Sequence, residues 1–327
     1  MDGPPVTGPV DTVSAVPDVI HAHPEEWGER TLRRVERLVS GLGIQLGAQA
    51  GILLDRHGYR VGADGSGPHR NVLGHPLFEL PVWLAQGSAL SDDALMDICE
   101  ASLCGYLSVR CDDDYFDGAW DDAGGAMILS GVFRARHHAL LAPLTSHRGF
   151  WERFEQVWRG YGEAMLLERS LHHPGSDYGR AQFGLVLGRS QPLEVPGEVV
   201  LAMIGRWEEA AGLREMVSHL NTATQLFDDF VDAPDDLEQE NFTWMVRRLG
   251  GFDGMSSLRQ GMIAGWDEVV GEIDQELGEA LRIGESLGLD DLRQWVSARR
   301  HLLDQASQRM FRVLFGTGGS DEPAGVA

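Results

Sequence analysis

The stretch that decides the fold is NTATQLFDDFVD, residues 221–232. At helical spacing, one line of this stretch is polar and most of the remaining circumference is apolar. The polar line consists of Ser218, Asn221, Gln225, Asp228 and Asp232. Pro234 predicts the end of the helix, so Asp228, Asp229 and Asp232 would lie in its last turn, where the helix dipole costs each carboxylate roughly 0.3–1 kcal/mol. A bound cation reverses that sign, which favours a polar line facing a cavity over one facing solvent.

A second aspartate cluster, CDDDYFDG at residues 111–118, ends another apolar run. Gly118 predicts the helix stop, and Asp113 and Asp117 share one face because they are four residues apart, as Asp228 and Asp232 are. One such cluster alone is usually a solvated turn. Two clusters with the same spacing, both at helix ends, predict carboxylates that face each other across a pocket and hold hard cations.

The composition bounds the class of protein. The chain has 327 residues, of which 43% are hydrophobic, enough for one large core. Its net charge of −23 opposes binding to nucleic acid or to an anionic membrane. All 27 basic residues are Arg and none is Lys, which excludes a Schiff-base lysine and a phosphate-loop lysine.

The three cysteines, Cys99, Cys104 and Cys111, lie on one predicted helix and match neither a zinc site nor a disulfide framework. This favours a reduced, cytoplasmic setting. The sequence contains no run of about 18 apolar residues and no charged-then-apolar leader, so we expect neither a membrane span nor a signal peptide.

Helical periodicity recurs along the chain, and alternating strand patterns are absent. We expect an all-α bundle of about ten helices around a central apolar cavity. The expected helical segments are 27–54, 77–86, 91–117, 126–141, 150–169, 178–188, a long one after Pro196, 252–287 and 289–315. Residues 1–24 are proline-rich and predict a flexible arm, residues 25–315 a single domain, and residues 316–327 a disordered tail.

The loop at residues 55–75 is rich in Gly and His. Its histidines lack a regular metal-binding spacing, so surface histidines are favoured over ligands, and its arginines are weak candidates for an anion contact. These residues are His57, His69, His75, Arg56, Arg60 and Arg70.

Facing carboxylates that share magnesium ions suit one task in particular, which is to grip a diphosphate and make it a leaving group. An apolar pocket then suits a greasy chain, and aromatic faces stabilise a carbocation. Ordinary core packing is favoured for each single aromatic residue, but candidates for such a face are Trp83, Phe183, Trp207 and Phe227.

The two motifs resemble those of the trans-isoprenyl diphosphate synthases and of the class I terpene synthases built on the same all-α fold. DDYFD at residues 113–117 looks like the first aspartate-rich motif of this superfamily, and QLFDDFVD at 225–232 looks like the second with its preceding Gln. Arg189-Ser190 stands where the family has Lys-Thr, and the resemblance spans about residues 70–250.

The resemblance implies a set of site residues, about three Mg²⁺ ions and a homodimer. The implied metal ligands are Asp113, Asp114, Asp117, Asp228, Asp229 and Asp232. Arg189 is the first candidate for a diphosphate contact, with Arg110 and Arg247 behind it. Further implied substrate-binding residues are Gln225, Phe227, Ser108 and Val109.

Two departures from the family pattern bear on the reaction. The early Gly-Lys-x-x-Arg-Pro element that binds isopentenyl diphosphate appears here as Gly74-His75-Pro76, without either cation. Where the family has an Arg pair after the first motif, the sequence reads Trp120-Asp121-Asp122. Loss of the second diphosphate site favours a terpene cyclase that ionises one prenyl diphosphate.

Two alternatives stay open. One is a prenyltransferase that joins an allylic chain to an acceptor, and the other is an inactive partner subunit. In the resembled family, side chains one turn before the first motif limit the length of the chain. Ser108, Val109 and, a turn further away, Gly105 are not aromatic, and Tyr106 is expected to point away from Ser108. We therefore expect geranylgeranyl diphosphate as substrate and a diterpene as product.

Overall fold

The computed structural model describes residues 24–59, 75–118, 120 and 123–315. These residues form twelve α-helices and three 3₁₀ helices and contain no strand, which confirms the predicted all-α class. The α-helices are α1 Pro24–Gly41, α2 Ile44–Arg56, α3 Glu79–Ala85, α4 Asp92–Phe116, α5 Ala123–Leu141, α6 Arg148–Leu171, α7 Arg180–Val186, α8 Val195–Met203, α9 Ala210–Glu238, α10 Trp244–Arg248, α11 Met255–Ser286 and α12 Asp290–Phe315. The 3₁₀ helices are η1 Leu187–Glu194, η2 Trp207–Glu209 and η3 Gly251–Asp253.

Several sequence predictions fall on residues outside this description. They are the arm before Pro24, the tail at residues 316–327, His69, Arg60, Arg70, Gly74, Asp121 and Asp122. The single helix expected at residues 27–54 is two helices, because the chain turns at Leu42, whose N–H donates to Val39 O at 3.1 Å, and restarts after Gly43. Glycine is a poor helix former, so closely spaced glycines favour this break.

Helix α4 lies at the centre of one side of the bundle. Its first turn is capped by Ser91, whose Oγ accepts a hydrogen bond from the Ala94 N–H at 3.3 Å. Most residues from Leu95 to Ser108 are buried, which explains the nearly uncharged sequence of this segment. The helix packs along α5 and also contacts α1 and α3, so its C-terminal end is held from several sides.

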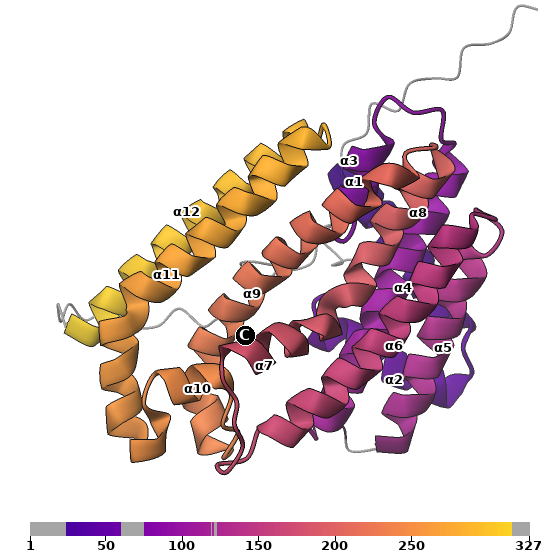
Figure 1. Cartoon of the computed structure of the whole chain (residues 1–327). Helices are drawn as coiled ribbons and strands as arrows, with labels where there is room; N and C mark the ends of the chain where they lie inside the picture. The colour runs from indigo at the N-terminus through magenta and orange to yellow at the C-terminus, as the bar shows by residue number, and fades with distance from the viewer. Residues whose placement is uncertain (1–23, 60–74, 119, 121–122, 316–327) are drawn as a thin grey trace, which may run out of the picture.

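Helix α9 runs between the α11–α12 hairpin and the side of the bundle formed by α4, α5 and α6 (Figure 1). It packs along α11 and reaches α10 and η1. The sequence prediction that Pro234 ends this helix is wrong, because α9 continues through Pro234 to Glu238. Phe230 and Ala233, immediately before the proline, are fully buried, and this packing offsets the hydrogen bond that the proline removes.

One continuous hydrophobic cluster joins the helices from α1 to α12. This agrees with a single core for the described part of the chain. Among these residues, no helix combines the length and the hydropathy that crossing a membrane requires.

Candidate active site

Helix α4 ends in three consecutive aspartates, and the fold turns each of them toward a different neighbour. Asp112 accepts hydrogen bonds from Arg134 Nη2 of α5 at 2.6 Å and from Tyr161 Oη of α6 at 2.9 Å. The Arg134 guanidinium also lies over the ring of Trp158, 4.4 Å from its centroid. Asp112 therefore fixes the rotation of α4 against α5 and α6.

Asp114 is held from the opposite side. It accepts a hydrogen bond from Arg56 Nη1 at 2.7 Å, and His57 Nε2 lies at 3.2 Å. Burial alone would raise the pKa of Asp114, but the hydrogen bonds from His57 and Arg56 outweigh it and lower that pKa. Asp114 is therefore directed toward α2, and its assignment as a metal ligand stays a prediction.

Asp113, between these two anchored residues, faces the polar space beside α9. Arg110 Nη1, one turn earlier, donates to Asp113 at 3.1 Å. Asp117 terminates α4, and Gly118 follows with φ +70°, the left-handed conformation that glycine adopts readily. Burial and the charge of Asp113 raise the pKa of Asp117, although the charges of Arg189 and Arg110 oppose the shift, so these two carboxylates are close.

Arg189 of η1 bridges α6 and α9. Its guanidinium forms an ion pair with Glu168 at 2.7 Å and donates to Gln225 Oε1 at 2.7 Å. Gln225 in turn donates to Asp229 through its amide nitrogen. The negative charges of Glu168, Asp113 and Asp229 outweigh desolvation and raise the pKa of Arg189, which keeps this side chain cationic in its buried position.

The second cluster lies about two to three turns before the end of α9. Burial, together with the charge of Asp232, raises the pKa of Asp228 to about 6. Burial likewise raises the pKa of Asp229 to about 7, although Arg189 and Gln225 oppose the shift. Because α9 extends beyond Pro234, burial and mutual repulsion account for these shifts, whereas the helix dipole acts mainly within the last turn.

Electrostatic coupling shows that the two clusters share one space. The pKa of Asp236 rises to about 6 through burial and the charges of Asp232 and Asp117, so the end of α4 faces the end of α9. The charges of Arg189 and Arg110 lower the pKa of Asp228, which places both guanidinium groups near the second cluster. Two arginines therefore lie between two sets of carboxylates.

No protein-family model and no curated protein sequence matches this chain. Solved structures do match it. The structure of a geranylgeranyl pyrophosphate synthase from Lactobacillus brevis superposes with a TM-score of 0.64 at 13% identity and covers 86% of this chain and 95% of its own. A heptaprenyl diphosphate synthase from Staphylococcus aureus gives the same TM-score and identity, with 86% and 98% covered. A polyprenyl synthase from Caulobacter crescentus, complexed with calcium and isoprenyl diphosphate, gives 0.56 at 14% identity over 85% and 94%.

The chain has the fold of the trans-isoprenyl diphosphate synthases. The first aspartate-rich stretch lies at the end of α4. The second lies about two to three turns before the end of α9, whereas the sequence predicted it in the last turn of that helix.

The residues of this isoprenyl-synthase fold can be tested for their fit to divalent cations. Within the described ranges, no three side chains already stand in a ligand cluster. Burial and the charges of neighbouring carboxylates nevertheless raise the pKa of Asp117, Asp228 and Asp232, and at Asp117 and Asp228 the charges of Arg189 and Arg110 offset this only in part. Hard cations with oxygen ligands offset such repulsion, so Asp113, Asp117, Asp228 and Asp232 fit the implied metal.

The guanidinium of Arg247 is bound by backbone carbonyl groups. It donates to those of Phe242, Ser176 and His173 at 2.9, 2.9 and 2.6 Å. These bonds tie the loop after α6 to the start of α10. Arg247 therefore has a structural role, and its assignment as a substrate contact stays a prediction.

Ser108 is also misplaced by the sequence prediction. It is buried against α5, where its Oγ lies 3.0 Å from Ser130 Oγ and accepts a hydrogen bond from Arg134 Nε at 3.2 Å. Val109 is half-buried beside it. Tyr106 occupies the other face, seven residues before Asp113 and therefore only about 20° from it around the helix. Its pKa responds to Arg110, Asp113 and Asp228.

Tyr106 is fixed by Tyr59 at the end of α2. The two rings meet edge to face with centroids 5.6 Å apart, and their hydroxyl groups are hydrogen-bonded. The helix rises about 10 Å between Tyr106 and Asp113. Two paired tyrosines, and not Ser108, therefore lie below the carboxylates on the side of α4 that faces α9.

Three groups near the site were not predicted from the sequence as functional. Glu168 and Asp236 carry no motif signal beyond lying on amphipathic helices. His75 was expected to be a surface histidine, but it faces Asn221 of α9 and lies near Arg110 and Arg189. Asn221 belongs to the polar line of the opening stretch, which was the one available signal.

Of the four aromatic residues considered as candidates, two lie toward the C-terminal end of α9 and two toward its N-terminal end. Phe227 lies within the aspartate cluster and is buried, and Phe183 packs on Trp244 with centroids 4.6 Å apart. Trp207 precedes α9, and Trp83 packs on Trp295 of α12. Nothing in this arrangement brings Trp83 or Trp207 to the carboxylates.

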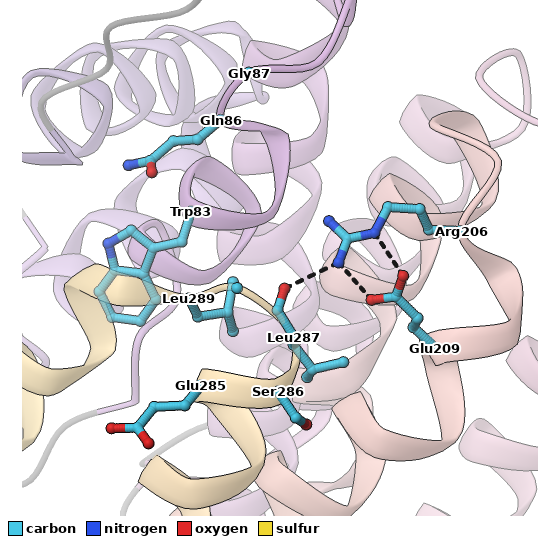
Figure 2. Close-up of a pocket in the computed structure, with 10 residues that line it drawn as sticks. Trp83, Gln86, Gly87, Arg206, Glu209, Glu285, Ser286, Leu287 and Leu289 are labelled. Atoms are coloured by element: carbon cyan, nitrogen blue, oxygen red, sulfur yellow. Dashed lines mark hydrogen bonds and ion pairs between the residues drawn. The ribbon is translucent and has the colours of Figure 1, made fainter.

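A pocket of about 610 Å³ lies at the start of α9 (Figure 2). It is formed by the end of α3, by η2 and by the α11–α12 turn, and Trp83, Arg206 and Leu287 are among its lining residues. Arg206 is occupied there, because it pairs with Glu209 and donates to Leu287 O at 2.9 Å. From Glu209 to Asp228 the helix rises about 28 Å, so this pocket is remote from the carboxylate site.

Proposed function

We propose that this chain is a magnesium-dependent class I terpene synthase that ionises one allylic prenyl diphosphate and cyclises the resulting carbocation. The observation that supports this most directly is the pair of facing carboxylate clusters with Arg110 and Arg189 between them. Cations beside repelling carboxylates form a site for an anionic group that arrives with metal ions. A diphosphate matches this combination.

The acidic and the basic residues of the site have different proposed roles. Asp113, Asp117, Asp228 and Asp232 would hold the metal ions, which when bound neutralise the diphosphate and improve it as a leaving group. Arg189 and Arg110 would bind the diphosphate oxygens as it departs. Arg189 is oriented for this by Glu168 and Gln225, at 2.7 Å each.

Substrate length follows from the paired tyrosines. A chain whose diphosphate lies at Asp113 meets Tyr106 after about 10 Å along α4. We therefore propose a chain shorter than geranylgeranyl, with farnesyl diphosphate as the first candidate, in place of the substrate expected from Ser108. The proposal treats residues 25–315 as one catalytic domain acting in a homodimer.

A prenyltransferase is the second candidate, and the structural neighbours favour it, since two of them are named geranylgeranyl pyrophosphate and heptaprenyl diphosphate synthases. Chain elongation requires cations for a second diphosphate. Among the described residues near the site, His75 stands where the resembled family has a cationic element. This departure favours cyclisation. An inactive subunit is disfavoured because both carboxylate clusters are present.

The test is an incubation of the purified chain with Mg²⁺ and geranyl, farnesyl or geranylgeranyl diphosphate, with and without isopentenyl diphosphate. Diphosphate release and gas chromatography with mass spectrometry are read together. We expect release with one substrate alone and a cyclic product. A linear product containing labelled isopentenyl carbon would establish the prenyltransferase instead, and no release with any substrate would establish an inactive subunit.

A further inference from the structure

Arg134 of α5 binds α4 at two points, just before the first aspartate motif. Its Nη2 donates to Asp112 Oδ2 at 2.6 Å, and its Nε donates to Ser108 Oγ, one turn earlier, at 3.2 Å. Ser108 is fully buried, and its hydroxyl also lies 3.0 Å from Ser130 Oγ of α5. One side chain of α5 therefore holds two successive turns of α4, which restricts both rotation and sliding of the helix at this end.

The guanidinium of Arg134 and its carboxylate partner are both held by α6. The Arg134 guanidinium lies over the ring of Trp158, 4.4 Å from its centroid. Tyr161 is only 3% exposed, and its Oη donates to the same Asp112 oxygen at 2.9 Å. The rings of Trp158 and Tyr161 meet edge to face with centroids 5.6 Å apart. Asp112 Oδ2 thus accepts hydrogen bonds from α5 and from α6 at once.

The direction of Asp112 determines where the next carboxylates point. Successive residues of a helix are about 100° apart, so Asp113 lies between Asp112 and Asp114 around α4, and Asp117 lies about 40° from Asp113. Asp114, on the other side, accepts a hydrogen bond from Arg56 Nη1 of α2 at 2.7 Å. The helix is therefore held on both sides of the carboxylates that are proposed to bind metal ions.

We propose that Arg134 is a positioning residue that increases the affinity of the site for Mg²⁺. It acts indirectly, because its bond to Asp112 fixes the orientation of Asp113 and Asp117. Groups that orient metal ligands in this way commonly contribute about 10–100-fold to metal affinity. The proposal rests on the metal-binding role of Asp113 and Asp117 in the proposed function.

The same helix offers a matched control two residues further along. Arg136 of α5 also pairs with a carboxylate of α4, since its Nε and Nη2 donate to Glu100 Oε1 at 2.8 and 2.6 Å. The side chains of Arg134 and Arg136 are 39% and 38% exposed. Glu100 has a second partner in Arg34 at 2.9 Å, as Asp112 has in its tyrosine. Glu100 lies about 20 Å before the metal-binding end of α4, so loss of Arg136 removes an equivalent ion pair away from the site.

The experiment compares wild type, Arg134→Gln, Arg134→Lys and Arg136→Gln. Calorimetric titration with Mg²⁺ in the presence of inorganic diphosphate measures metal affinity without turnover, and diphosphate release from the preferred prenyl diphosphate is measured over a range of Mg²⁺ concentrations. We expect Arg134→Gln to weaken Mg²⁺ binding about 10-fold or more and to keep kcat at saturating Mg²⁺ within about threefold of wild type. Arg134→Lys should recover part of the affinity, because it keeps a charge for Asp112 but not the fork that also reaches Ser108. Arg136→Gln should bind Mg²⁺ as wild type does, even where its Tm is lower.

Equal Mg²⁺ affinity in wild type and Arg134→Gln overturns the positioning role and leaves the proposed function intact. An equal loss of affinity in Arg136→Gln also overturns it, because any ion pair between α4 and α5 would then suffice. If wild type binds no Mg²⁺, both proposals are wrong, and if it binds Mg²⁺ but releases no diphosphate from any substrate, only the proposed function is wrong. If Arg134→Gln does not fold, Tyr161→Phe replaces it by removing the other hydrogen bond to Asp112, and an unchanged affinity there counts against the proposal.

Discussion

Replacing Asp228 with Asn separates the effect of this carboxylate on stability from its proposed role in binding metal ions. In the metal-free protein, burial and Asp232 raise the pKa of Asp228 from 3.8 to about 6. Each pKa unit corresponds to 1.36 kcal/mol, so keeping Asp228 ionised above pH 7 costs at most about 3 kcal/mol. Asn has nearly the same shape without the charge. We expect Asp228→Asn to be more stable than wild type by about 1–3 kcal/mol at pH 8 in EDTA.

The pH dependence has a definite sign. Because the folded pKa is above the unfolded one, the contribution of Asp228 to stability is fully present below about pH 4 and is lost as the pH rises through about 6. The advantage of Asp228→Asn should therefore shrink as the pH falls from 8 to 4.5. Urea unfolding at both pH values measures this, with a shift in Tm of about 2 °C per kcal/mol as a second readout.

Asp114→Asn is the matched control. It also removes a carboxylate next to the site, but it is expected to lower the stability of the protein where Asp228→Asn raises it. The pKa of Asp114 is lowered by His57 and Arg56, and its side chain is only 6% exposed. Breaking this buried pair should destabilise the protein by about 3–5 kcal/mol. Added Mg²⁺ should raise the Tm of wild type but not of Asp228→Asn. A variant at Asp228 that is less stable than wild type in EDTA at pH 8 would refute the reasoning.

Four further variants and the addition of isopentenyl diphosphate test the site. Tyr106→Ala should move the preferred substrate toward geranylgeranyl diphosphate, and an unchanged length profile would exclude a limit on chain length at Tyr106. Ser108→Phe should instead cost about 1–3 kcal/mol of stability by overpacking against α5. Arg189→Ala should lower kcat/KM by at least about 10²-fold, corresponding to about 2.7 kcal/mol of transition-state stabilisation. Arg247→Ala should instead lower Tm by several degrees and keep the activity per folded molecule. A clear loss of activity per folded molecule would show that Arg247 acts in the site. Isopentenyl diphosphate should neither accelerate diphosphate release nor enter the product, which labelled substrate would reveal.

The sequence alone determined the all-α fold class. Helical periodicity with buried apolar faces predicts helices wherever it occurs, because it depends only on spacing along the chain. The two aspartate motifs are local patterns of the same kind. Their spacing puts Asp113 and Asp117 on one face of a helix, and Asp228 and Asp232 likewise, while the roles of these residues stay predictions.

The tertiary structure decided which neighbours each of these side chains contacts. Three consecutive aspartates are equivalent in sequence, but Asp112 and Asp114 are bound by partners at least 22 residues away in the chain. Ser108 and Tyr106 differ by 200° around α4, so only the placement of α5 and α9 distinguishes a buried serine from a cavity tyrosine. Such contacts join residues far apart in sequence, and neither propensity nor spacing encodes them.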